Sequence, residues 1–305
     1  MTIICVGGAG FIGSHLTDRL VKDGHEISVI DNLSTGKFKN LEKSISEITF
    51  INGDIRDLDL LMEKFKGIDV VFHTAALARV QPSIKDPIKW NENNITGTLN
   101  VLWAAAQNKV KRVIYSASSS AYGNQKKMPL IESMIPNPMS PYALQKLVGE
   151  MYCKLFSDIY GLETVCLRYF NVYGERQTEL ADGPYATVIG VFLGQKKKGM
   201  PLTIIGDGTQ SRDFTYVDDI VEANIRAMKT EMVGKGETIN IGKGDDQSIN
   251  KIADLIDPKG KRKYLPKRIE PKKTLASNEK CKELLGFKPE TTIEEVIKKW
   301  DKINK

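Results

Sequence analysis

A glycine-rich turn near the N-terminus constrains the fold of this chain more than any other feature of the sequence. The segment VGGAGFIG, residues 6–13, follows the apolar run TIICV and leads into FIGSHLTDRLVKDG, where apolar residues recur at helical spacing. A glycine turn between a strand and a helix lets the backbone approach a pyrophosphate, which the free N–H groups and dipole of the helix then stabilise. Gly7, Gly10 and Gly13 therefore predict a dinucleotide site. A turn kept only for packing is the less favoured alternative, because both flanking elements have the required type.

Two acidic residues at the ends of the next apolar runs extend this prediction. Asp31 ends EISVID, the second strand-like run, where a carboxylate can hold both hydroxyls of an adenosine ribose. The same charge repels a 2′-phosphate, so the sequence predicts NAD rather than NADP. Asp54 follows the third run, ITFINGD, and is a candidate to bind the adenine amine.

The order of strands and helices predicts a parallel sheet. The runs DVVFHTAA and KRVIYSAS continue the series of strands, and helical patterns lie between the strands at about 57–66, 93–108 and 142–160. Strands that alternate with helices form a parallel sheet covered on both faces. We therefore expect an α/β fold of the Rossmann type, with a doubly wound parallel sheet.

The pattern becomes irregular after a sixth strand, ETVCLRYFNVYG, which predicts a second, smaller domain. We expect residues 1–168 to form the NAD-binding domain, rejoined by residues at about 214–241. Residues 169–305 would mainly form a mixed α/β C-terminal domain that binds the substrate.

The segment SPYALQK, residues 140–146, contains a candidate catalytic pair. Tyr142 and Lys146 are one helical turn apart and share a helix face, so their polar ends can converge. A phenol has a pKa of about 10, and a neighbouring ammonium and a positive nicotinamide would both lower it. Ser118, in SASSSAYG after the fifth strand, is the candidate partner for a reacting hydroxyl. A polar turn and a solvated helix face explain each feature alone, but less well beside a dinucleotide turn.

In combination, these motifs resemble the extended short-chain dehydrogenase/reductase family, and within it the UDP-glucose 4-epimerase group. The resemblance rests on the glycine turn, Asp31, HTAA at 73–76, Ser118 with Tyr142 and Lys146, and LRYFNVYG, and it continues to ELLGFKPE at 283–290. It implies that Tyr142 takes the proton of a sugar 4-hydroxyl while a hydride passes to tightly held NAD. A 4-keto sugar then rotates in the site and accepts the hydride on its other face. Ser118 would hold the 4-oxygen, and Lys146 would bind ribose and tune Tyr142.

The resemblance also extends the sets of binding residues. Where related chains read RPGE, this one reads KRIE, so the phosphate-binding cation would be Arg268 or Lys267. Arg212 would pair with the diphosphate, for which a guanidinium has suitable geometry; an ion pair with Asp213 is the alternative. The expected NAD-binding residues are Gly7, Gly10, Phe11, Ile12, Gly13, Asp31, Asn32, Asp54, Ile55, Ala75, Ala76, Asn94, Ser116, Tyr142, Lys146 and Tyr169. The expected substrate-binding residues are Ser118, Ser119, Tyr142, Asn171, Arg212, Arg268 and Thr274.

The residues after Ser118 favour epimerisation over related reactions. A 4,6-dehydratase of this family would carry an Asp–Glu pair, and a decarboxylase a glutamate, where this chain has Ser119 and Ser120. The resemblance implies that Thr274 stands at the position that, in the 4-epimerase group, helps set the size of the sugar pocket. Because threonine is small, we expect UDP-GlcNAc and UDP-GalNAc to be substrates besides UDP-glucose and UDP-galactose.

Two other functions remain open at this point. A UDP-glucuronate 4-epimerase, or another nucleotide-sugar enzyme, would suit the net charge of +6. A sensor or scaffold that binds NAD without turnover is the alternative from another class, although the intact Ser118, Tyr142 and Lys146 argue against it.

Composition excludes several further classes. No apolar run approaches a membrane span, and no basic leader precedes the first strand, so we expect a cytoplasmic protein without a membrane partner. Four scattered cysteines predict buried thiols, with neither disulfides nor a metal site. The basic segment 258–273 lacks interleaved aromatic residues, so we expect a solvated surface and no nucleic-acid partner.

The resemblance implies a homodimer formed by the helices at 93–108 and 142–160, whose apolar residues include Leu147, Met151 and Leu155.

Overall fold

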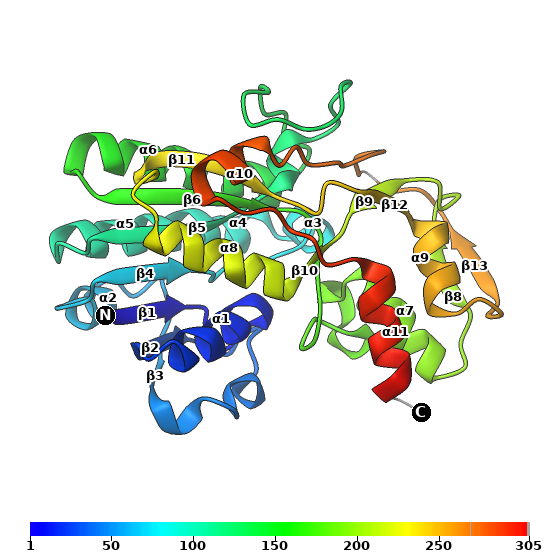
Figure 1. Ribbon diagram of the computed structural model, residues 1–305, viewed down its shortest axis with the longest axis horizontal. Coiled ribbons are helices and arrows are strands. Elements are labelled where there is room, and N and C mark those ends of the chain that lie inside the picture. The colour runs from blue at the N-terminus through cyan, green and yellow to red at the C-terminus, as the bar shows by residue number, and fades with distance from the viewer. Residues whose placement is uncertain (269, 304–305) are drawn as a thin grey trace.

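A seven-stranded parallel sheet forms the centre of the computed structural model, which describes residues 1–268 and 270–303 (Figure 1). The strand order is β11-β6-β5-β4-β1-β2-β3, and each neighbouring pair is parallel. The strands are β1 (Thr2–Val6), β2 (Glu26–Asp31), β3 (Ile48–Asn52), β4 (Val70–His73), β5 (Arg112–Ser118), β6 (Glu163–Tyr169) and β11 (Lys235–Ile241). This confirms the predicted sheet.

Helices cover both faces of the sheet. Successive residues of a strand point to opposite sides, so apolar residues in a row make both faces apolar. Ile3 and Cys5 of β1 belong to a core cluster on one face, and Ile4 and Val6 belong to a cluster on the other. The first cluster includes residues of α1 (Phe11–Lys22), α8 (Val217–Lys229) and α10 (Glu279–Leu285). The second includes residues of α2 (Leu58–Lys64), α5 (Gly97–Gln107) and α6 (Pro141–Tyr160). The doubly wound α/β architecture is therefore confirmed.

The helix α6 carries the predicted catalytic pair and has well-defined ends. The Ser140 hydroxyl accepts a hydrogen bond from the Ala143 amide at 3.2 Å, and Pro141 occupies the first turn. Gly161 ends the helix in the left-handed conformation. The pattern at 93–108 is more broken than expected: α4 (Pro87–Asn91) leads through a π-helical turn (Glu92–Thr96) into α5.

A smaller part of the chain lies beside the carboxyl ends of the sheet strands (Figure 1). It contains three two-stranded sheets and has its own core cluster. The pairs are β7 (Val172–Tyr173) with β10 (Thr215–Tyr216), β8 (Leu202–Ile205) with β13 (Arg262–Leu265), and β9 (Ser211–Asp213) with β12 (Asp246–Ser248). Its helices are α7 (Val188–Lys197), α9 (Ile249–Ile256) and α11 (Ile293–Ile303).

The chain returns to the central sheet after entering this smaller part. Strand β11 pairs with β6 at the edge of the sheet, and α8 packs against α1. The domain boundary between residues 168 and 169 itself stays a prediction. The remaining short elements are α3 (Val80–Lys85) and the 3-10 turns Phe38–Leu41, Ile45–Glu47, Ser119–Tyr122 and Leu180–Tyr185.

All four cysteines are buried and free, as predicted. Across the part of the chain that the structure describes, no helix has both the length and the apolar character that a bilayer crossing requires.

Candidate active site

A cavity of about 460 Å³ opens at the carboxyl ends of the central strands. Its lining comes from the turn after β1, the ends of β2, β5 and β6, the loop after β4, and the smaller part of the chain. Ligands of open α/β folds bind at this edge of the sheet. The cavity lining includes Gly7, Gly10, Phe11, Ile12, Gly13, Asp31, Asn32, Ile55, Ala75, Ala76, Ser118, Ser119, Tyr142, Tyr169, Asn171, Arg212 and Thr274, all of which the sequence predicted as site residues.

The glycine turn has the close packing that a pyrophosphate site requires. Gly7 has a φ of +82°, and a Cβ there would lie 2.5 Å from the Ala75 amide nitrogen. A Cβ on Gly13 would lie 2.2 Å from the carbonyl oxygen of Gly7. Helix α1 begins after Gly10, and a glycine has no side chain with which to cap the helix. The first N–H groups of α1 are therefore left for an anion to bind. The turn therefore fits a dinucleotide.

Asp31 lies where the sequence predicted, at the end of β2 in the cavity wall. Its carboxylate accepts hydrogen bonds from the amides of Ala9 at 3.0 Å and Leu33 at 2.8 Å. Burial raises the pKa of this carboxyl above its ordinary value, and the two amide hydrogen bonds oppose that shift. The carboxylate is thus held at the cavity edge, which fits recognition of a ribose diol.

Asp54 is not among the described residues of the cavity lining, and its contact with adenine stays a prediction. Its carboxylate pairs with Arg56 at 2.8 Å and accepts a hydrogen bond from Asn32 Nδ2 at 2.8 Å. The hydrogen bonds from Arg56 are the main cause that lowers the Asp54 pKa to about 2. Asp54 therefore supports Asn32, which does line the cavity.

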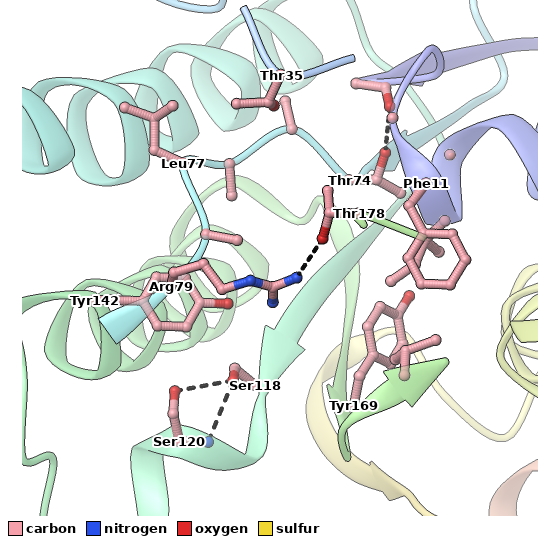
Figure 2. Close-up of a pocket in the computed structure, with 18 of the residues that line it drawn as sticks. Phe11, Thr35, Thr74, Leu77, Arg79, Ser118, Ser120, Tyr142, Tyr169 and Thr178 are labelled. Atoms are coloured by element: carbon pink, nitrogen blue, oxygen red, sulfur yellow. Dashed lines mark hydrogen bonds between the residues drawn. The ribbon is translucent and has the colours of Figure 1, made fainter. Parts of the chain in front are cut away.

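The catalytic candidates Tyr142 and Ser118 line the same cavity (Figure 2). Ser118 Oγ accepts hydrogen bonds from the Ser120 amide at 3.2 Å and the Ser120 hydroxyl at 2.9 Å. Burial raises the pKa of the Tyr142 phenol, while hydrogen bonding with Ser118 and the charge of Arg79 act to lower it. The sequence predicted a pKa lowered by Lys146 and a bound nicotinamide; in the structure burial outweighs the lowering, which comes from Ser118 and Arg79, and the effect of nicotinamide stays a prediction.

Lys146 is buried behind the wall of the cavity. Its Nζ donates a hydrogen bond to the Ser116 carbonyl at 2.8 Å and lies 4.8 Å from the centre of the Tyr115 ring. Burial lowers the pKa of this ammonium to about 8. Lys146 thus anchors the end of β5, next to Ser118, and its contact with a ribose stays a prediction.

Two further predicted residues also support the wall from behind. Ser116 Oγ donates a hydrogen bond to the Tyr169 hydroxyl at 3.1 Å. Asn94 accepts a hydrogen bond from the Leu77 amide at 2.8 Å and donates one to the Leu77 carbonyl at 3.0 Å. Neither Ser116 nor Asn94 is among the described lining residues, although each is hydrogen-bonded to one that is.

The predicted phosphate-binding residues lie on the side of the smaller part. Arg212 is buried, and its Nη2 lies 2.8 Å from a carboxylate oxygen of Glu270. The alternative pairing with Asp213 is wrong, because that carboxylate accepts hydrogen bonds from the amides of Lys243, Gly244 and Ala276. Burial raises the pKa of Asp213 to about 6.

The other substrate-side residues divide between the cavity and the surface. Asn171, with a φ of +27°, donates a hydrogen bond to the Asp213 carbonyl at 2.9 Å, and Thr274 is buried in the lining. Arg268 is exposed, and Lys267 lies 3.5 Å from Asp207. Within the described lining the cationic residues are Arg212 and Arg79, so neither Arg268 nor Lys267 is placed at the cavity.

The polar residues of the cavity wall that sequence reasoning missed include Arg79, Thr178 and Glu270, and Ser120 as a partner of Ser118. Arg79 had a usable signal, because it is a cation three residues after the HTAA segment that was expected to line the cofactor. Thr178 and Glu270 lie in irregular segments, where spacing carries no information about position.

Comparison with known proteins agrees with this geometry. Residues 3–242 match the model of the NAD dependent epimerase/dehydratase family. A putative UDP-glucose 4-epimerase of Methanocaldococcus jannaschii is 38% identical over 311 residues, which cover 99% of each chain. The solved UDP-glucose 4-epimerase of Thermotoga maritima, with UDP-glucose, is 36% identical with a TM-score of 0.93 and full coverage of both chains. The UDP-N-acetylglucosamine 4-epimerase of Methanobrevibacter ruminantium, in complex with UDP-N-acetylmuramic acid, is 40% identical with a TM-score of 0.92, over 100% of this chain and 99% of that one. The chain therefore belongs to the NAD dependent epimerase/dehydratase family, which confirms both the resemblance and the predicted cofactor.

Proposed function

We propose that the chain is a UDP-sugar 4-epimerase, an isomerase that inverts carbon 4 of the sugar through transient oxidation. The observation that carries this proposal is that Tyr142 and Ser118 share one cavity with the glycine turn and Asp31. The names of the three relatives reported above support it. The test is incubation with individual UDP-sugars, followed by separation of the products by anion exchange.

In this proposal each wall of the cavity has one task. NAD, when bound, accepts a hydride from carbon 4 and returns it. The turn at Gly7 and Gly13 would hold the pyrophosphate, and Asp31 the adenosine ribose. Tyr142 would take the proton of the 4-hydroxyl and return it to the ketone oxygen, while Ser118 would donate a hydrogen bond to that oxygen.

The diphosphate of the substrate would bind at Arg212 and Asn171. Arg212 presents a planar guanidinium in the lining, which suits two phosphate oxygens. Glu270 pairs with this guanidinium at 2.8 Å, so a binding diphosphate would replace the Glu270 carboxylate as the partner of Arg212. This exchange keeps the buried cation paired before and after binding.

We expect UDP-glucose, UDP-galactose, UDP-GlcNAc and UDP-GalNAc all to be substrates. Thr274 is small and lines the cavity, with its hydroxyl 3.4 Å from Asn171 Nδ2, so it leaves room beside the sugar. Replacing Thr274 with Tyr should lower kcat/KM for the N-acetyl sugars by about 100-fold relative to UDP-glucose. Thr274→Ser is the matched control and should retain all four activities. Rejection of both N-acetyl sugars by the unmodified enzyme would contradict this expectation.

A UDP-glucuronate 4-epimerase is the second candidate, and one observation favours it. The guanidinium of Arg79 lies in the cavity beside Tyr142, where it could meet a sugar carboxylate (Figure 2). UDP-glucuronate therefore belongs in the same substrate panel. Turnover of any panel member would exclude a non-catalytic NAD-binding sensor.

We also propose that two copies of the chain associate through α6 and α5. Four apolar side chains of α6 are exposed along one face: Leu144 (50%), Met151 (64%), Leu155 (45%) and Ile159 (62%). Trp103 of α5 stacks edge-on against Tyr160 of α6, which extends this apolar face onto the second helix. Burying such a face against a second copy removes it from water.

The oligomeric state can be measured by light scattering at micromolar concentration. We expect the mass of two chains for the unmodified protein and of one chain for the double variant Met151→Glu, Ile159→Glu. Met200 follows α7 and is 47% exposed, so Met200→Glu is the matched control and should remain dimeric. A single-chain mass for the unmodified protein would refute the dimer.

A cytoplasmic location is part of the same proposal. The four free, buried cysteines support it, because such thiols persist in a reducing compartment.

A further inference from the structure

Arg79 is a cation in the cavity that the mechanism above does not use. It lies in the loop after β4, and Figure 2 shows its guanidinium beside the ring of Tyr142. Its Nη2 donates a hydrogen bond to the Thr178 hydroxyl at 3.0 Å, on the opposite wall. Its backbone has a φ of +94°, a conformation that residues other than glycine rarely adopt. A strained residue at a cavity is kept only where its surroundings hold it, and such residues concentrate at functional sites.

The loop that carries Arg79 is hydrogen-bonded to the catalytic helix on both sides. On one side Asn94 binds the backbone of Leu77 and donates a hydrogen bond to Gln145 of α6 at 3.0 Å. On the other side Ser83 Oγ accepts a hydrogen bond from the amide of Tyr142 at 3.2 Å. The two contacts involve Leu77 and Ser83, which lie on either side of Arg79 in the sequence. They therefore fix the position of the Arg79 backbone relative to Tyr142.

The charges around the phenol favour an interaction between these two side chains. Burial lowers the pKa of the Arg79 guanidinium, and its interaction with Tyr142 opposes that effect. The same interaction acts to lower the pKa of Tyr142, as does hydrogen bonding with Ser118. An arginine stays protonated throughout the working range of an enzyme, so its charge is constant. The other titratable groups around this end of the cavity include Tyr115 of β5, His73 of β4, Lys146 and Glu150 of α6, Tyr169 of β6, and the pair of Arg212 and Glu270.

Resting on the proposed function, we propose that Arg79 is a positioning residue of the epimerase, a second cation that stabilises the phenolate of Tyr142. Lys146 donates its hydrogen bond to the Ser116 carbonyl, whereas Arg79 lines the cavity together with Tyr142. The contact with Thr178 holds the guanidinium in this place and joins the β4 loop to the substrate side. The phenolate is the form of Tyr142 that can take a proton, so its population sets the activity at low pH.

The test is the pH dependence of kcat/KM for Arg79→Met and Arg79→Lys, measured with a neutral UDP-sugar and with UDP-glucuronate. Removing the charge should move the acidic limb of the profile upward by about one pH unit, while Lys should restore most of the original position. Thr178→Val removes the hydrogen bond partner but keeps the charge, and should move the limb less than Arg79→Met. An unmoved limb in Arg79→Met would overturn the proposal. So would a loss confined to UDP-glucuronate, because Arg79 would then bind a substrate carboxylate.

A second measurement does not depend on turnover. The ultraviolet absorbance of tyrosinate can be titrated in the NAD-loaded protein, with Tyr142→Phe subtracted to isolate Tyr142. We expect this phenol to titrate at higher pH in Arg79→Met than in the unmodified protein, and an identical titration would overturn the proposal. If no UDP-sugar is turned over, the proposed function fails, yet this titration still decides whether Arg79 acts on Tyr142.

Discussion

Replacing Tyr142 with Phe is expected to abolish epimerisation while NAD remains bound. The substitution removes only the hydroxyl that would exchange a proton with the sugar 4-oxygen. General acid–base groups contribute about 10²- to 10⁴-fold to a rate, so turnover should fall by at least that factor. The glycine turn and Asp31, which would hold the dinucleotide, lie on other elements and are unchanged. Turnover is measured with each UDP-sugar, and bound NAD by its release on denaturation.

A matched control separates the loss of this hydroxyl from a general effect of the replacement. Tyr264 lies on β13 and is 57% exposed, and Tyr264→Phe should retain both turnover and NAD. Near-normal turnover in Tyr142→Phe would remove Tyr142 from its proposed role. Loss of NAD together with turnover would instead assign Tyr142 chiefly to cofactor binding.

Replacing Gly13 with Ala is expected to prevent tight binding of NAD. The new Cβ would lie 2.2 Å from the Gly7 carbonyl oxygen and 2.8 Å from Thr74 Oγ1, so the turn must shift. Overpacking of this kind costs about 1–3 kcal/mol. If the turn can no longer enclose the pyrophosphate, the NAD dissociation constant should rise by about tenfold or more. The measurement is calorimetric titration of NAD into protein stripped of the dinucleotide, with circular dichroism to establish that the variant folds.

Two further variants keep this prediction decisive. Gly24 follows the C-cap of the first helix, with a φ of +78° and open space around it, so Gly24→Asn should fold and bind NAD normally. Asp31→Ala tests the other end of the site if Gly13→Ala fails to fold. It should weaken NAD by about tenfold, because a charged hydrogen bond is worth about 1.5–3 kcal/mol. Unchanged NAD affinity in both Gly13→Ala and Asp31→Ala would refute the predicted cofactor site.

The sequence predicted a residue's position at the cavity where that position follows from its local element. The turn at Gly7 to Gly13 and the carboxylate of Asp31 needed only a strand, a tight bend and a helix in order, and each lies in the cavity wall. The spacing of Tyr142 and Ser118 relative to strand ends was enough to bring them to the same edge of the sheet.

The predictions were less complete where a role depends on which neighbour a side chain meets. Asp54 and Arg212 are charged, and their partners in the structure are Arg56 and Glu270, which spacing did not indicate. Lys146 shares a helix with Tyr142, yet its ammonium donates to the Ser116 carbonyl behind the wall. Ion pairs form between whichever groups the packed chain brings together, so the pairing of charges is a property of the fold.

The order of strands, helices and glycines along the chain determined the doubly wound sheet, the edge at which ligands bind, and the dinucleotide turn. These features arise from periodicity and backbone conformation, which are local. Only the tertiary structure decided that Arg79 stands beside Tyr142, that Thr178 meets it across the cavity, and that Glu270 pairs with Arg212. Those contacts join segments far apart in sequence, and the packing of the smaller part against the sheet edge sets their distances.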